Sequence, residues 1–198
     1  MGGPPMSPAD PLALFRDLFA AAAARESADP TAAALATADA AGRPAVRMVL
    51  VKGVDEAGFR FFTNLESRKA SELAANPRAA LCFWWPTLAR QVRVEGDVTR
   101  LDDDASDRYF ATRPRDSQLG AWASRQSAVL VSREELLRRV AEAAARYGGR
   151  SVPRPPFWAG FLLAPQTIEF WSAGDHRLHE RERFRREGDG WAREWLYP

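Results

Sequence analysis

The sequence contains very little of the chemistry that disulfides and metal sites require. Its 198 residues include one cysteine and two histidines. Cys82 alone cannot form an intrachain disulfide, and its apolar neighbours predict a small core residue. His176 and His179 have no cysteine or third ligand beside them, so we expect no metal site. This composition is typical of the reducing cytoplasm, where we expect the protein to act.

Long hydrophobic runs and an excess of one charge are also missing. The longest apolar stretch, Leu18 to Ala24, is far shorter than the ~20 residues that a membrane helix needs. Residues 1–5 lack the cationic start and apolar core of an export signal. Lys and Arg total 28 and Asp and Glu 26, which gives a net charge of only +2. We therefore expect neither a membrane nor a nucleic acid as a partner.

The common nucleotide-phosphate motifs are absent as well. The sequence has no GxGxxG fingerprint and no GxxxxGK[ST] loop, which excludes a Rossmann dinucleotide site and a P-loop. A bound phosphate would need another kind of site. The aromatic residues cluster in strand-like runs, where side chains are more often core than ring-stacking platform. The residues expected in the core on this ground are Phe59, Phe61, Phe62, Phe83, Trp84 and Trp85.

What the sequence does contain is one helical segment followed by many short strands. Apolar residues at helical spacing predict an amphipathic helix over residues 9–25. Apolar or alternating runs between turn signals predict strands at 33–39, 44–54, 58–64, 79–86, 90–101, 157–163, 167–172, 178–186 and 191–196. Further helices are predicted at 67–76, 103–112 and 116–124, and from a capping box of Ser132 and Glu135 to Gly148.

These elements predict an α+β chain that is mainly β. Strands come first and last with helices inserted between them, which favours a small β-barrel with peripheral helices, because closure leaves no exposed sheet edge. On pattern alone a sandwich stays open as an alternative. No repeat or long linker divides the chain, so we expect a disordered N-terminus over residues 1–8 and a single domain over 9–198.

Three basic clusters in the first two thirds of the chain are candidate phosphate sites. Two of them lie at predicted helix starts, where cations are unfavourable unless an anion offsets the positive end of the dipole. In the third, strict alternation puts the two cations on opposite faces of a buried strand, so that either one lies at a strand end or bulge or the two serve different ligands. Ordinary caps with exposed basic side chains are the alternative for the helix starts. The clusters are Arg68-Lys69 after a capping Ser67, Arg113 and Arg115 before a capping Asp116 or Ser117, and Arg47 with Lys52.

A fourth basic cluster precedes the predicted C-terminal hairpin. A strand beginning near Arg177 would put Arg177, His179, Arg181 and Arg183 on one face. Like charges on one sheet face repel, so such a row is favoured when an anion or acidic side chains lie between them. The alternative is a solvated hairpin with Arg–Glu pairs.

Together these motifs resemble the pyridoxamine 5′-phosphate oxidases in order and spacing. The matching segments are 47–52 (RMVLVK), 62–64 (FTN), 67–69 (SRK), 90–92 (RQV), 113–117 (RPRDS), 126–127 (QS), 168–171 (IEFW) and 177–181 (RLHER). The resemblance covers residues from about 10 to 198. It implies an FMN-binding split β-barrel, and a homodimer with an FMN in each of two clefts at the subunit interface.

The resemblance also implies roles for individual residues. FMN contacts would come from Arg47, Met48, Val49, Leu50, Lys52, Phe62, Thr63, Arg68, Lys69, Gln91, Gln126, Ser127, Trp171 and Arg181. Substrate contacts would come from Lys52, Tyr109, Arg113, Ser117, Arg177 and His179, with Arg177 and His179 as catalytic residues. The implied reaction oxidises pyridoxamine or pyridoxine 5′-phosphate to pyridoxal 5′-phosphate with O2 as acceptor, releasing H2O2. Phe62 stands where many relatives have tyrosine.

Other functions stay open at this point. A related split-barrel flavin oxidase acting on a phenazine-type ring is one, although the candidate phosphate-binding residues favour a phosphorylated substrate. A non-enzymatic carrier of FMN or pyridoxal phosphate is another. A β-rich single-stranded nucleic-acid binder using Trp84 and Trp85 would need a more basic chain.

Overall fold

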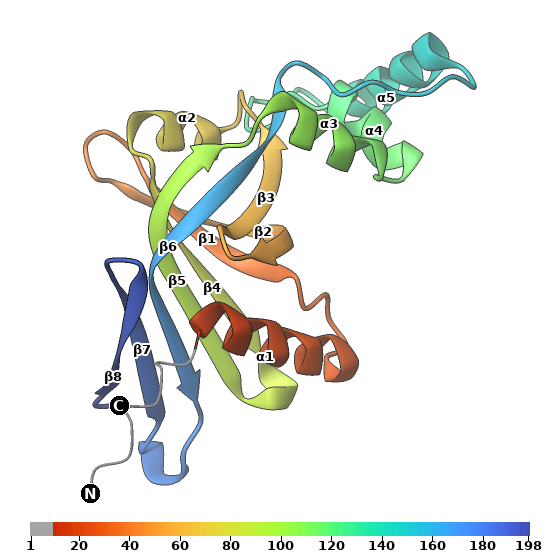
Figure 1. Cartoon of the computed structure of the whole chain (residues 1–198). Helices are drawn as coiled ribbons and strands as arrows, with labels where there is room; N and C mark the ends of the chain where they lie inside the picture. The colour runs from red at the N-terminus through yellow and green to blue at the C-terminus, as the bar shows by residue number, and fades with distance from the viewer. Residues whose placement is uncertain (1–9) are drawn as a thin grey trace, which may run out of the picture.

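Eight antiparallel strands form one continuous sheet that closes on itself. The computed structural model describes residues 10–198, so the disorder predicted for residues 1–8 lies outside the described part. The strand order is β3-β2-β1-β4-β5-β6-β7-β8, and β3 also pairs with β6, which closes β1 to β6 into a barrel (Figure 1). The strands are β1 (Ala32–Ala38), β2 (Pro44–Asp55), β3 (Gly58–Asn64), β4 (Arg78–Trp85), β5 (Arg90–Arg100), β6 (Trp158–Ser172), β7 (Glu180–Glu187) and β8 (Gly190–Leu196).

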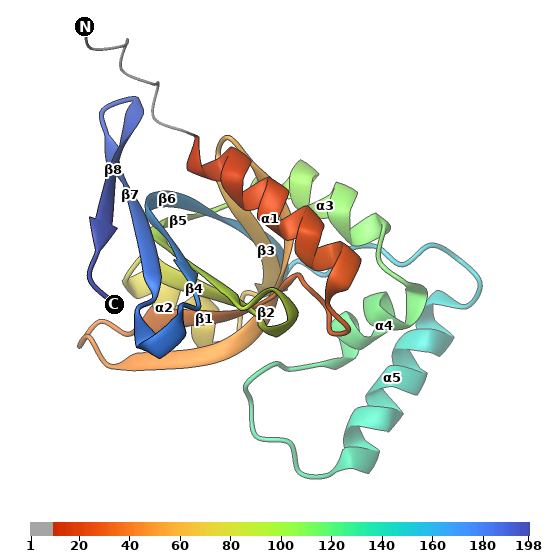
Figure 2. The same cartoon turned by 90° about the horizontal axis from the view of Figure 1, so that it is seen from below.

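Five helices surround this barrel. The first lies across one barrel opening, and the others gather at the opposite end of the sheet (Figures 1 and 2). They are α1 (Pro11–Arg25), α2 (Arg68–Ala75), α3 (Asp103–Ala111), α4 (Arg115–Ala123) and α5 (Arg133–Tyr147), with short 3-10 turns η1 (Pro86–Leu88) and η2 (Asp175–Arg177). No helix within residues 10–198 is long and apolar enough to cross a membrane.

The barrel core is aromatic and is closed by α1. The Asp10 carboxylate caps this helix by accepting hydrogen bonds from the N–H groups of Leu12 and Ala13. One turn later, the buried Phe15 ring meets Phe59 and Phe83 at centroid distances of 4.8 and 5.0 Å. These edge-to-face contacts add to the area that Phe15 buries, so α1 is part of the core.

A second apolar cluster attaches the helices to the start of β6. Phe110 of α3, Leu119 of α4 and Tyr147 of α5 are buried together with Trp158. The cluster fixes α3 and α4 beside β3, since β3 is the barrel neighbour of that end of β6. This packing brings residues that are far apart in sequence to one end of the barrel.

The sequence pattern predicts these elements to within about two residues, with one exception in the number of strands. The barrel is confirmed, but segments 157–163 and 167–172 form one strand, β6. The pairing of β6 with β5 shifts register between Glu95 and Gly96, and this β-bulge carries the strand past Pro165.

Two expected core residues are more accessible than predicted. Cys82 is half-buried, and burial raises the pKa of its thiol, which disfavours the nucleophilic thiolate. Trp84 is 52% exposed, because it alternates with the buried Phe83 and Trp85 on β4. Phe59 and Phe61 are fully buried as predicted.

Replacing Phe15 with alanine should show that α1 is part of the core. We expect Phe15→Ala to lower the free energy of unfolding by about 3–5 kcal/mol, because it leaves a cavity between α1 and the barrel. Val129→Ala is the matched control, since Val129 is 97% exposed, and it should change stability by less than about 0.5 kcal/mol. Urea unfolding at one fixed protein concentration measures both. Equal effects would contradict the role of Phe15.

Candidate active site

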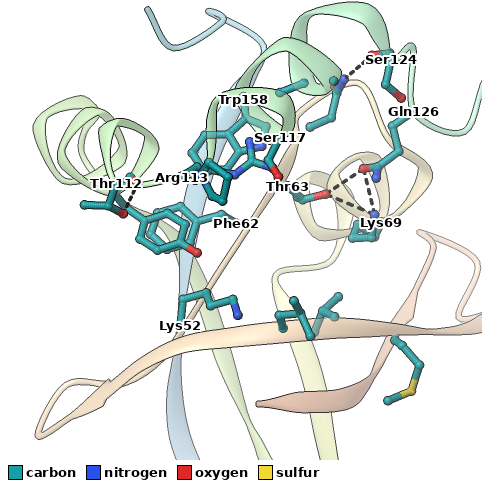
Figure 3. Close-up of a pocket in the computed structure, with 18 residues that line it drawn as sticks. Lys52, Phe62, Thr63, Lys69, Thr112, Arg113, Ser117, Ser124, Gln126 and Trp158 are labelled. Carbon is teal, nitrogen blue, oxygen red and sulfur yellow. Dashed lines mark hydrogen bonds between the residues drawn. The ribbon is translucent and has the colours of Figure 1, made fainter. Parts of the chain in front are cut away.

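A cleft of about 700 Å³ opens between the barrel and the helices beside it. Strand β2 forms one wall, and residues of β3, α2, α3, α4 and the segment after α4 lie across the cleft from it (Figure 3). Many of the residues predicted from the resemblance line this cleft. They are Met48, Val49, Leu50, Lys52, Phe62, Thr63, Lys69, Tyr109, Arg113, Ser117 and Gln126.

One end of the cleft is a stack of aromatic rings that holds an arginine. The Phe62 ring stacks on Tyr109 and on Trp158, with centroid distances of 3.9 and 5.3 Å and planes tilted by 17° and 10°, and the Tyr109 and Trp158 centroids are 6.2 Å apart. Phe62 therefore lines the cleft and packs against the second apolar cluster, outside the barrel core. The Arg113 guanidinium lies 5.0 Å from the Trp158 ring and 5.5 Å from that of Phe110.

Arg113 has hydrogen-bonding capacity that the protein does not use. Its Nη1 atom is buried and has no hydrogen-bond partner within residues 10–198. Burial lowers the pKa of Arg113, and the nearby Tyr109 opposes this shift. Arginine stays protonated in proteins, so the side chain is a cation with a free donor. Such a group is well suited to bind an anion in the cleft.

A second cation lies at the opposite side of the same cleft. Lys69 is only 8% exposed, and its Nζ atom donates to Thr63 Oγ1 and Gln126 Oε1, each at 3.1 Å (Figure 3). Within residues 10–198, no carboxylate lies within 4 Å of this ammonium group. Burial lowers the pKa of Lys69, and the charge of Arg47 lowers it further. The ammonium group thus has only neutral partners and would gain from a bound anion.

Arg47, Arg68 and Ser127 lie beside this cation without lining the cleft. Ser127 Oγ accepts a hydrogen bond from the Arg68 N–H at 3.2 Å. Both guanidinium groups bind one carboxylate, that of Glu72, at 3.0 Å from Arg47 and 2.7 Å from Arg68. Sequence reasoning missed Glu72; the signal was an acidic residue one turn after Arg68-Lys69 on the same helix.

The capping predictions for the two basic helices are only partly right. Ser67 occupies the N-cap position of α2, but its hydroxyl makes no capping hydrogen bond. Helix α4 begins at Arg115 with Pro114 as its N-cap, so Asp116 and Ser117 lie inside the first turn and cap nothing. Proline fits this start because its fixed φ suits the entry into a helix. Ser132 does cap α5 as predicted.

The remaining predicted residues form a second group at the other end of the sheet. Gln91 of β5 pairs with Trp171 of β6, which in turn pairs with Arg181 of β7. The His179 ring lies 4.5 Å from that of Trp171, and Arg177 is exposed in the adjoining turn. Strand β6 spans 15 residues, roughly 45 Å at the rise of a β-strand. One chain therefore does not bring this group to its own cleft.

The predicted strand through this group begins later than expected. Arg177 and His179 precede β7, so the prediction that they share a strand face with Arg181 and Arg183 is wrong. Residues 176 and 177 have φ values of 54° and 65°, which no regular strand allows. Gly174 makes the turn possible, because a Cβ there would overlap the Leu178 carbonyl oxygen.

Arg181 is held by an acidic residue that sequence reasoning also missed. Its Nε and Nη2 atoms donate to the two oxygens of Glu169 at 2.9 and 3.1 Å. This bidentate pair raises the pKa of Arg181. Glu169 is buried in an otherwise apolar stretch of β6. A lone acid in such a run was the available signal, since a buried charge needs a partner.

Comparison with known proteins identifies the family. A sequence model described as pyridoxamine 5′-phosphate oxidase matches residues 19–147, and one described as pyridoxine 5′-phosphate oxidase C-terminal dimerisation region matches residues 158–198. The fold and cleft define an FMN-binding split barrel of the oxidoreductase class. The chain belongs to the pyridoxamine 5′-phosphate oxidase family, whose cofactor is FMN.

Individual relatives match over nearly the whole chain. A pyridoxine/pyridoxamine 5′-phosphate oxidase of Anaeromyxobacter dehalogenans is 61% identical over 195 residues, which is 98% of each chain. One of Rhodospirillum rubrum is 56% identical over 96% of each chain. The crystal structure of PhzG from Burkholderia lata, in complex with tetrahydrophenazine-1-carboxylic acid, superposes with a TM-score of 0.90 at 34% identity, covering 96% of this chain and 94% of that one.

Replacing Lys69 should stabilise the flavin-free protein in a pH-dependent way. In the folded protein the pKa of Lys69 lies below its ordinary value of 10.5. The charged form therefore destabilises the folded state at neutral pH, and this destabilisation disappears as the pH rises toward 10.5. We expect Lys69→Met to raise the free energy of unfolding by about 1 kcal/mol at pH 7, with the gain shrinking by pH 10. Urea unfolding across this range measures it.

Lys52→Met is the control, because the Lys52 ammonium group is more exposed and lies 4.0 Å from the Asp29 carboxylate. It should give no comparable gain. A Lys69→Met effect that is constant with pH would contradict the desolvation argument.

Proposed function

We propose that this protein is an FMN-dependent oxidase that converts pyridoxamine or pyridoxine 5′-phosphate to pyridoxal 5′-phosphate in the cytoplasm, with O2 as acceptor and H2O2 as product. The observation that carries the proposal is that one cleft contains two cations, Arg113 and Lys69, that have no anionic partner in the described residues. Two phosphorylated molecules, the cofactor and the substrate, would satisfy both. The 61% identity to a protein of that name supports the same conclusion.

The residues around Lys69 fit the phosphate of FMN. The buried ammonium group lacks an anionic partner, and the terminal nitrogens of Arg68 have no hydrogen-bond partner within residues 10–198. Thr63, Gln126 and Ser127 supply neutral polar groups beside them. FMN, when bound, supplies the redox chemistry by accepting two electrons from the substrate and passing them to O2. The protein supplies position and charge.

The aromatic end of the cleft fits the substrate phosphate. We assign phosphate binding to Arg113, Tyr109, Ser117 and Lys52, with each charge-assisted hydrogen bond contributing about 1.5–3 kcal/mol. Figure 3 shows Lys52 on β2 across the cleft from Arg113. The Phe62 stack fixes the ring of Tyr109, which limits the entropy lost when a phosphate binds.

A second copy of the chain would complete the site. Arg177 and His179, the proposed catalytic residues, lie at the far end of β6 from the cleft, together with Gln91, Trp171 and Arg181. A homodimer would place this group against the partner's cleft. The exposed apolar row of Val46, Met48 and Leu50, of which Met48 and Leu50 line the cleft, supports such a contact. The dimerisation region described for residues 158–198 agrees with it.

The geometry of the η2 turn suggests what His179 does there. Its Nδ1 atom accepts a hydrogen bond from the Gly174 N–H at 3.3 Å. In a neutral imidazole the other nitrogen, Nε2, then carries the proton. We propose that His179 donates a hydrogen bond to the substrate. The exposed Arg177 would pack against the ring of the substrate.

A phenazine-type substrate is the second candidate. It is favoured by the likeness to PhzG, which was crystallised with tetrahydrophenazine-1-carboxylic acid. The carboxylate of such a substrate would pair with one cation of the cleft. The higher identity to the phosphate oxidases favours the phosphorylated substrate.

Anaerobic addition of substrate tests the activity directly. The purified protein should show a flavin spectrum, and pyridoxine or pyridoxamine 5′-phosphate should bleach it. Admitting air should restore the colour and yield pyridoxal 5′-phosphate. A yellow protein that neither compound bleaches would point to a carrier or to a phenazine-type oxidase, and a colourless protein that cannot take up FMN would overturn the proposal.

Replacing Arg113 tests its assigned role. We expect Arg113→Met to raise KM for pyridoxine 5′-phosphate at least tenfold while changing kcat less, because phosphate binding contributes equally to the ground and transition states. Flavin content should be unchanged. Arg108→Gln is the control, since Arg108 is an exposed arginine on α3, the helix that precedes Arg113. Equal KM values for wild type and Arg113→Met would contradict the assignment.

A further inference from the structure

Glu72 connects the two arginines beside the proposed FMN phosphate site. It is on α2 and is only 4% exposed. Its Oε2 atom accepts hydrogen bonds from Arg47 Nη2 at 3.0 Å and from the Thr37 hydroxyl, and its Oε1 atom accepts from Arg68 Nε at 2.7 Å. Both carboxylate oxygens are therefore used.

The same network fixes Arg47 from its other side. Arg47 Nη1 donates to the Leu35 carbonyl oxygen at 3.2 Å and to the Thr37 hydroxyl. Arg47 thus has partners on both terminal nitrogens, whereas Arg68 is anchored only through Nε. The anchor leaves both terminal nitrogens of Arg68 available in a fixed fork, the arrangement that binds a phosphate in a bidentate way.

The charge of Glu72 is secured by these contacts. The hydrogen bond from Thr37 lowers the pKa of Glu72 most, and those from Arg68 and Arg47 add to it, against the opposing effect of burial. Within residues 10–198, Glu72 is the one carboxylate within 4 Å of either arginine. An anion held next to a phosphate site is unfavourable by charge alone, so its presence calls for a reason of geometry.

We infer that Glu72 is a positioning residue that holds Arg47 and Arg68 in place for the phosphate of FMN. This inference rests on the proposed function, since it takes FMN as the ligand. Glu72 does not touch the phosphate in this arrangement. Because Glu72 orders the two long side chains before the cofactor binds, less conformational entropy is lost on binding. Its negative charge reduces the Coulomb attraction between the arginines and the phosphate.

The competing effects have opposite signs, which makes the inference testable. If Glu72 acted only through its charge, removing that charge would strengthen FMN binding. If it acts by positioning, Glu72→Gln will weaken binding, because the glutamine amide has one acceptor oxygen and releases one of the arginines. Riboflavin carries the same ring without the phosphate, so its affinity reports on the rest of the site.

The experiment titrates flavin-free full-length protein with FMN and with riboflavin, following flavin fluorescence. We expect Glu72→Gln to raise the Kd for FMN at least tenfold and that for riboflavin less than threefold. Glu95→Gln is the matched control, because Glu95 pairs with Arg93 at 2.6 Å on the half-exposed barrel surface. It should change neither Kd.

Unchanged or tighter FMN binding by Glu72→Gln would overturn the inference, and so would an equal loss for both flavins, which indicates a structural role only. Should Glu72→Gln not fold, Glu72→Asp decides, since it keeps the charge and draws the carboxylate back by one methylene from Arg47 and Arg68. A loss of FMN affinity without loss of riboflavin affinity is expected there too, and its absence would overturn the inference. A wild-type protein that does not prefer FMN to riboflavin would instead contradict the proposed function.

Discussion

The pairing of β6 with both β3 and β5 is the constraint on which the rest of the structure depends. This pairing closes the barrel. The first residue of β6, Trp158, packs against helices α3, α4 and α5 and holds them beside the cleft. The last residues of β6, around Trp171, carry the second group of predicted site residues. A strand of this length can serve both ends only because a bulge lets it pass Pro165 without losing its partners. The barrel and the division of the site into two groups therefore have the same cause.

The cleft itself is organised by charges that the protein leaves unbalanced. Arg113 and Lys69 are desolvated without an anionic partner of their own, which costs stability in the flavin-free state. Elsewhere in the described residues, the partly buried Arg181 is paired with Glu169, and Arg47 with Glu72. The contrast separates cations that lack an anionic partner in the described residues from cations that a buried carboxylate holds in place.

Much of the fold could be predicted from the sequence, because alternation and turn residues are local signals. The helix over residues 9–25 and the strands up to residue 100 follow from periodicity alone. The turn after Trp171 could not be predicted in this way, since left-handed φ values at His176 and Arg177 depend on how Gly174 meets Leu178. The prediction of Asp116 or Ser117 as the N-cap of α4 was wrong, because Pro114 can also start a helix and the local sequence does not decide between them.

The cleft residues were predictable only through the resemblance. Spacing along the chain does not show which residues far apart in sequence lie together in the fold, and the resemblance does. Glu72 and Glu169 were missed because their local signals, an acid one turn after Arg68 and a lone acid in an apolar run, do not identify the arginine that each acid holds. Their roles emerge only when the partners are seen in space. Phe62 was ambiguous between core and cleft for the same reason, since its neighbour Phe61 has the same side chain on the opposite strand face.

The separation along β6 has a consequence for mixtures of damaged chains. In the proposed dimer, every complete site takes its cleft from one chain and its η2 turn from the other. A chain damaged in the cleft and a chain damaged in the turn would each be inactive alone. When they combine, one of the two sites receives both damaged parts and the other receives both intact ones. Two defective copies of this sequence could thus restore a working enzyme between them, which no single-chain site allows.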